Sequence, residues 1–137
     1  MPRLPRLDGL RILIVDDSAD GRTLTSLVLS QAGASVKAVA SVREALKMLE
    51  IERPDVLVTD IGLPDEDGFA LVRHIRQSEA ERGGFLPAIA LTGYARAEDR
   101  VGILAAGFQA HIPKPVEPVE LAAVIANITG HLQDVEP

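Results

Sequence analysis

The sequence contains no cysteine, which excludes both a disulfide framework and a thiolate metal site. No uninterrupted apolar run approaches the roughly 20 residues that a membrane-spanning helix needs, and the N-terminal MPRLPRL lacks the apolar segment of a signal peptide. The basic residues are scattered and the net charge is -6, which argues against direct binding of nucleic acid. We therefore expect a soluble, cytoplasmic protein with no membrane or nucleic-acid partner.

The sequence does contain enough apolar residues for one compact domain. Of its 137 residues, 47% are hydrophobic, which suits a single core. We expect a flexible N-terminal segment at residues 1–8, one domain at residues 9–131 and a C-terminal tail at residues 132–137. Because the sequence ends there, we expect no attached effector domain, and the domain is either a stand-alone protein or part of a longer chain.

Short apolar runs alternate five times with stretches in which apolar residues recur at helical spacing, such as Leu24, Leu27 and Val28. Ser41, with Glu44 three residues later, is typical of a helix start, and Gly33 and Gly107 are placed as glycines that end helices. This alternation predicts βαβ units and a mainly parallel sheet that is covered on both faces. The five predicted strands lie at residues 12–15, 36–40, 56–58, 88–91 and 110–112.

Polar residues mark the carboxyl ends of these strands. Asp16 and Asp17 follow the first strand, Asp60 follows the third, Thr92 the fourth and Lys114 the fifth. If strands one and three are neighbours, as in the flavodoxin-like order 2-1-3-4-5, their ends lie about 5 Å apart and three carboxylates converge. Converging carboxylates repel unless a cation lies between them. A site made of oxygen ligands alone points to Mg²⁺, with Mn²⁺ as an alternative ion.

The charges at this edge are suited to phosphoryl transfer. Three carboxylates carry -3, whereas Mg²⁺ and Lys114 carry +3, which leaves a nearly neutral cleft for one phosphoryl group. Thr92 adds a hydroxyl donor. Asp60 is the best nucleophile candidate because it is the single central carboxylate, and its product would be an aspartyl phosphate.

Each of these residues also has a purely structural interpretation. An acidic pair or a threonine after a strand can cap the next helix, and Lys114 can be an ordinary exposed lysine. Their joint placement at the ends of different strands favours the functional interpretation. We expect Pro64 and Gly68 to shape the loop after the third strand, and the acids at residues 65–67 to be exposed loop and helix-start residues.

Four motifs occur together in a specific order: VDD at 15–17, TDIGLPDEDG at 59–68, ALTGYA at 90–95 and PKP at 113–115. Over about residues 9–131 they resemble the receiver domain of two-component response regulators. The resemblance implies an α/β, flavodoxin-like (CheY-like) three-layer sandwich, with a five-stranded parallel sheet in the order 2-1-3-4-5 and five helices. The segments LTGYARAED and AGFQAHIPKP look similar to receivers of hybrid histidine kinases, which favours a phosphorelay role.

The resemblance also implies roles for the acidic residues. Asp60 would accept a phosphoryl group from the phosphohistidine of a histidine kinase or of a histidine phosphotransfer protein. Mg²⁺ would bind to Asp17, Asp60 and the backbone carbonyl of Gly62, with Asp16 acting directly or through water. The chain would then be a phosphorylated signalling protein rather than an enzyme, although it could catalyse its own dephosphorylation.

The remaining implied roles concern switching. Lys114 would contact the phosphoryl group, Thr92 would move toward it, and the bond from Lys114 to Pro115 would be cis. The family commonly has Tyr or Phe three residues before the lysine, where this chain has His111, so we expect the switch to be read out differently. The expected output surface is formed by the fourth helix, the fifth strand and the fifth helix.

Two other functions fit part of the pattern. A haloacid-dehalogenase-like Mg²⁺-dependent phosphatase shares the residue types, but its nucleophile motif follows the first strand, whereas here the acidic pair comes first. A degenerate receiver that serves only as an interaction module would not need the full set of acids. A dinucleotide-binding site is excluded because no G-x-G-x-x-G follows the first strand.

Overall fold

The computed structural model describes residues 4–93 and 97–130. The expected tail at residues 132–137 and the end of the ALTGYA motif lie outside the described residues. None of the helices in the described part has the length and apolar character needed to cross a membrane.

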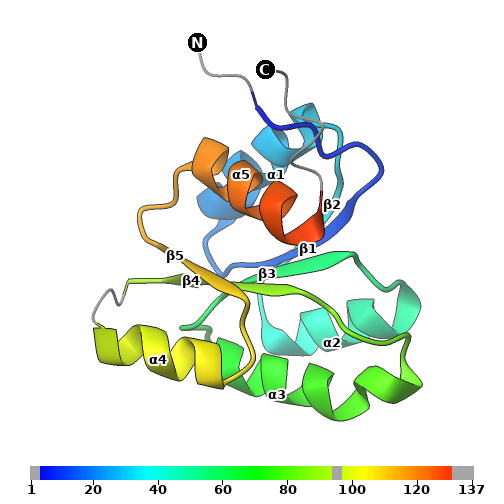
Figure 1. The fold of residues 1–137 in the computed structure, drawn as a ribbon, viewed down its shortest axis with the longest axis vertical. Helices are drawn as coiled ribbons and strands as arrows, with labels where there is room; N and C mark the ends of the chain where they lie inside the picture. Colours follow the sequence, from blue (N-terminus) through cyan, green and yellow to red (C-terminus); the bar gives the residue numbers. More distant parts are fainter. Residues whose placement is uncertain (1–3, 94–96, 131–137) are drawn as a thin grey trace.

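The centre of the molecule is a parallel sheet of five strands in the order β2-β1-β3-β4-β5, which confirms the predicted order (Figure 1). Val15 of β1 pairs with Thr59 of β3, and Asp60 of β3 pairs with Leu91 of β4. This register brings the carboxyl ends of the three central strands to one edge of the sheet. The strands are β1 (Arg11–Val15), β2 (Ser35–Val39), β3 (Val56–Asp60), β4 (Ala88–Thr92) and β5 (Ala110–Pro113).

Two helical layers cover the sheet, with α1 and α5 on one face and α2, α3 and α4 on the other (Figure 1). Alternate strand residues face opposite layers: Ile12 and Ile14 pack in the cluster with α1 and α5, whereas Leu13 and Val15 pack in the second buried cluster. The helices are α1 (Ala19–Gln31), α2 (Val42–Ile51), α3 (Gly68–Ser78), α4 (Ala97–Ala105) and α5 (Pro118–Thr129), with a short 3₁₀ turn, η1 (Glu79–Glu81).

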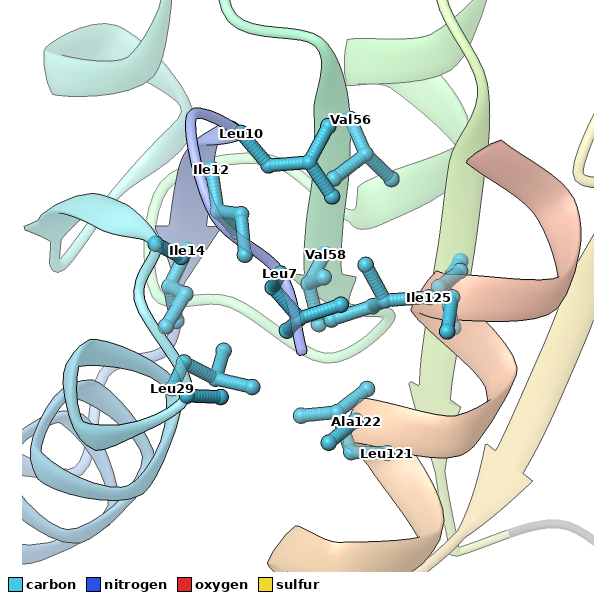
Figure 2. Close-up of a cluster of buried hydrophobic side chains, with 14 of the residues drawn as sticks. Leu7, Leu10, Ile12, Ile14, Leu29, Val56, Val58, Leu121, Ala122 and Ile125 are labelled. Atoms are coloured by element: carbon cyan, nitrogen blue, oxygen red, sulfur yellow. The ribbon is translucent and has the colours of Figure 1, made fainter. Parts of the chain in front are cut away.

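The N-terminal segment lies against the domain from residue 4 onward. Leu7 is completely buried, and its backbone N–H donates a 2.8 Å hydrogen bond to the carbonyl of Ala32. Figure 2 shows Leu7 among Leu29, Val58 and Ile125. We expected residues 1–8 to be flexible, but a buried leucine anchors this segment because its apolar side chain completes the cluster between α1 and α5. The boundary at residue 9 itself stays a prediction.

The buried side of α1 is not the one that carries Leu24 and Leu27. Thr25, Leu29 and Ala32 point inward, whereas Leu24 and Leu27 are 51% and 55% exposed. Residues 25, 29 and 32 share one side of a helix at the spacing i, i+4, i+7, and small side chains let α1 approach β2 and α5. The apolar spacing of Leu24, Leu27 and Val28 therefore identified a helix correctly, and its core-facing side is formed by Thr25, Leu29 and Ala32.

Candidate functional site

Three carboxylates meet at the carboxyl edge of the sheet. Asp16 and Asp17 follow β1 directly, and Asp60 is the last residue of β3. One carboxylate oxygen from each of the three lies within 4.8 Å of the others. The convergence expected from the sequence is present in the structure.

The side chain of Asp60 has no exposed surface. Apart from the Lys114 ammonium group, no residue in the described part of the chain donates a hydrogen bond to the oxygens of Asp60. Lys114 Nζ lies 3.0 Å from Asp60 Oδ1 and forms an ion pair with it. Burial, and then the neighbouring Asp16 carboxyl group, raise the pKa of Asp60 to about 7 against the opposing effect of Lys114.

The loop after β1 holds Asp16 in place. Its Oδ1 accepts a 2.9 Å hydrogen bond from the backbone N–H of Ser18, and Arg22 donates to its carbonyl at 2.8 Å. A Cβ added at Gly21 would lie 2.4 Å from Asp16 Oδ2, so a glycine there leaves space for the carboxylate. Ser18 is the side-chain cap of α1, so neither Asp16 nor Asp17 serves as the cap of this helix. The Asp17 side chain is exposed.

The loop after β3 packs closely on the backbone of Asp60. Gly68 N–H donates a 2.7 Å hydrogen bond to the carbonyl of Ile61. A Cβ at Gly68 would lie 2.4 Å from the carbonyl oxygen of Asp60. Only a glycine therefore lets α3 begin this close to the strand. Pro64 and Gly62 are exposed in the same loop.

Asp65 has a structural role that the sequence did not reveal. Its two carboxylate oxygens accept hydrogen bonds from the backbone N–H groups of Val42 at 3.1 Å and Arg43 at 3.0 Å. Ser41 Oγ accepts from the N–H of Glu44 at 3.2 Å, which confirms Ser41 as the N-cap of α2. These bonds satisfy three of the free N–H groups at the start of α2, and those to Asp65 hold the pKa of its carboxyl group below its usual value.

The switch candidates lie beside the acidic edge. Thr92 is 2% exposed and lines a cavity of about 170 Å³ together with Ile61, Phe69, Asp99 and Ile103. The backbone N–H of Lys114 donates a 2.8 Å hydrogen bond to the carbonyl of Thr92. His111 is partly buried on β5, paired in register with Ala90. The bond between Lys114 and Pro115 is cis, as the resemblance implied.

The model of the response regulator receiver domain family matches residues 12–126. This chain therefore belongs to the response regulator receiver family. It is 44% identical over 125 residues to an uncharacterized 14.6 kDa protein of Leptolyngbya boryana, with 91% of this chain and 92% of the relative covered. It is also similar to the sensor histidine kinase GacS of Pseudomonas protegens, at 36% identity over 88% of this chain.

Solved structures agree with this assignment. A CheY-like receiver domain protein of Methanospirillum hungatei matches with a TM-score of 0.78 and 33% identity, covering 90% of this chain and 96% of the other. The chain is also 35% identical, over 83% of its length, to the transcriptional regulator PhoP of Salmonella typhimurium. Both PhoP and GacS are longer proteins: the chain spans 49% of PhoP and 13% of GacS. Members of this family are phosphoacceptor signalling modules that occur in regulators and hybrid kinases. The family match does not favour the alternative of a phosphatase.

Receiver domains bind Mg²⁺ at an acidic pocket, and the acidic residues here fit that ion. The three carboxylates offer only oxygen ligands, which Mg²⁺ prefers. Apart from Lys114 at Oδ1, no described residue donates to the oxygens of Asp60, and a buried acceptor such as Oδ2 without a partner is costly. A divalent cation would provide that partner and reduce the repulsion between the carboxylates.

Proposed function

We propose that Asp60 is the phosphoacceptor of a two-component or phosphorelay system. A carboxylate oxygen of Asp60 attacks the phosphorus of a phosphohistidine as the phosphorus–nitrogen bond breaks, which leaves an aspartyl phosphate and a free histidine. One observation carries this proposal: Asp60 is buried with Asp16 and Asp17 close by, and among the described residues only Lys114 contacts its oxygens as a donor. In this proposal the nucleophile would lie between the bound cation and the Lys114 ammonium group.

The proposed metal ligands are Asp17, Asp60 and the backbone carbonyl of Gly62, with Asp16 acting directly or through water. When bound, Mg²⁺ or Mn²⁺ would supply positive charge that offsets the charge on the phosphoryl oxygens. Asp16 is suited to a supporting part because the backbone N–H of Ser18 fixes the position of its carboxylate.

Lys114 and Thr92 would respond to the new phosphate. The Lys114 ammonium group already lies in contact with Asp60 and would neutralise an added phosphoryl oxygen. Thr92 borders a cavity of about 170 Å³, which gives its side chain room to change position. This shift would alter the surface of α4, β5 and α5, which we propose as the output face by resemblance. His111 lies on this face, where the family commonly has an aromatic ring.

The proposed phosphoryl donors are a histidine kinase or a histidine phosphotransfer protein, acting in the cytoplasm. The similarity to the GacS sensor kinase as well as to transcriptional regulators supports both a phosphorelay and a simple two-component pathway. The residues around Asp60 could also promote hydrolysis of its own phosphate. We treat this as part of the signalling cycle rather than as turnover of an external substrate.

Intact mass spectrometry tests the proposal directly. The protein is incubated with phosphoramidate and Mg²⁺, and we expect the mass of one phosphoryl group to be added. Asp60→Asn, or removal of the metal with EDTA, should abolish the addition. Asp20→Asn is a matched control because Asp20 is an exposed acid in the first turn of α1, and it should label like the wild type. Labelling that persists in Asp60→Asn would remove Asp60 from the assigned role.

A further inference from the structure

A groove runs between α2 and α3 on the face of the sheet opposite α1 and α5, where Figure 1 shows the two helices side by side. It consists of two hollows of about 330 and 390 Å³ that share Leu46 and Glu50 in their walls. The groove extends from Asp65 and Glu66 in the loop after β3 to Arg82 beyond η1. Leu46 and Leu49 are partly exposed in its wall, whereas Ile75 and Leu86 form its floor and are only 5% and 1% exposed.

The charge of this groove differs from that of the whole chain. Its lining includes four of the 14 lysines and arginines but only three of the 20 acids, so it carries +1 whereas the chain carries -6. The four cations are Arg43, Lys47, Arg53 and Arg82, and the three acids are Glu50, Asp65 and Glu66. The groove is therefore locally positive, although the chain as a whole is acidic.

Most of this positive charge is available to a partner. Within the described residues, Arg43, Lys47 and Arg82 form no ion pair with an acid. By contrast, the carboxylate of Asp65 is engaged by two backbone N–H groups at the start of α2. Among the residues that the structure describes, Glu50 and Glu66 also form no ion pair. The three unpaired cations therefore outnumber the two unpaired acids of the lining and can meet carboxylates from another molecule.

We propose that the α2–α3 groove binds an amphipathic helix of a partner protein whose apolar stripe is flanked by acidic residues. The leucine side chains of such a helix would contact Leu46 and Leu49, and its carboxylates would meet Lys47 and Arg82. This surface is separate from the phosphorylation chemistry and from the α4, β5 and α5 face. Asp65 nevertheless links it to the loop that follows Asp60, because Asp65 belongs to that loop and lines the groove.

Binding of two synthetic peptides tests this proposal. Each is a labelled helix of about 14 residues, roughly four turns, with leucines at i, i+3, i+4 and i+7. One carries glutamates at its polar positions and the other carries lysines. Fluorescence anisotropy at low salt should show the glutamate peptide binding at least about tenfold more tightly. Amide NMR shifts should then concentrate on α2, α3 and the loop before α3.

Charge reversal within the protein provides a second test. Lys47→Glu combined with Arg82→Glu should weaken binding of the glutamate peptide about tenfold. The matched control is Lys37→Glu combined with Arg100→Glu, which changes the net charge equally at exposed positions on β2 and α4 and should bind nearly as well as the wild type. All measurements use the Asp60→Asn background, so that a failure of the phosphoacceptor proposal does not affect them.

Several results would overturn the proposal. Equal affinity for the two peptides, no binding of the glutamate peptide, NMR shifts centred on another face, or equal losses in the two double variants would each do so. The peptide comparison uses unaltered groove residues, so it decides the question even if the Lys47→Glu, Arg82→Glu protein does not fold.

Discussion

The buried Asp60 carboxyl group predicts how stability depends on pH in the metal-free protein. Its pKa is raised from 3.8 to about 7, chiefly by burial. A raised carboxyl pKa means that the unfolded chain releases this proton at lower pH than the folded protein does. The contribution of Asp60 to stability is therefore fully present below about pH 4 and is lost as the pH rises through about 7.

The size of this effect follows from the pKa shift. A change of about three pKa units at 1.36 kcal/mol per unit gives about 4 kcal/mol. No discount for solvent screening is needed at Asp60 because its side chain has no exposed surface. Asp60→Asn has nearly the same shape and cannot ionise. In EDTA, the variant should gain about 4 kcal/mol over the wild type in free energy of unfolding between pH 4 and pH 8.

Urea denaturation followed by circular dichroism measures this difference across the pH range. Asp20→Asn serves as the control and should differ from the wild type by less than about 0.5 kcal/mol at every pH. Addition of Mg²⁺ at pH 8 should stabilise the wild type and leave Asp60→Asn nearly unchanged. A constant difference between Asp60→Asn and the wild type from pH 4 to pH 8 would refute the reasoning.

Two further predictions concern the loop after β3. Gly68→Ala should lower the free energy of unfolding by about 1–3 kcal/mol in urea denaturation, because the new Cβ would lie 2.4 Å from the Asp60 carbonyl oxygen. Gly102→Ala in α4 is the control, and it should not destabilise the protein because the space around Gly102 is open. Asp65→Ala should speed hydrogen exchange of the Val42 and Arg43 amides, whereas Glu66→Ala should not. Hydrogen bonds lower the pKa of Asp65 in the folded protein. In the wild type, the Val42 and Arg43 amides should therefore be protected from exchange above the pKa that Asp65 has in the unfolded chain. This protection should be lost as the pH falls through the pKa of Asp65 in the folded protein. Unchanged exchange in Asp65→Ala would show that the contact does not hold the start of α2.

The cluster of acids at the carboxyl edge of the sheet could be predicted from the sequence, because the residues next to each acid in the chain already mark its position. Each candidate residue follows a short apolar run, and parallel strands place their carboxyl ends at one edge. Once the strands were identified, Asp16, Asp17 and Asp60 could be grouped without knowing any side-chain position. The strand order was the one global fact required, and the motif resemblance supplied it.

Other features could not be predicted because they depend on packing between distant segments. The carboxylate of Asp65 reaches the start of α2 across 22 and 23 residues, and no periodicity marks such a contact. Leu7 is buried because it fills a space between α1 and α5, which cannot be inferred from MPRLPRL. The inward face of α1 could not be predicted either, because Thr25 and Ala32 carry a weaker apolar signal than the exposed Leu24 and Leu27.

The central claim is that acids distant in the sequence share one divalent ion beside the phosphoacceptor. Anomalous diffraction from a crystal soaked in Mn²⁺ tests this claim most directly. We expect a single strong peak within coordination distance of Asp17, Asp60 and the carbonyl of Gly62, with Asp16 in direct or water-mediated contact. A map with no peak at this edge, or with manganese bound only at other acids, would contradict the account.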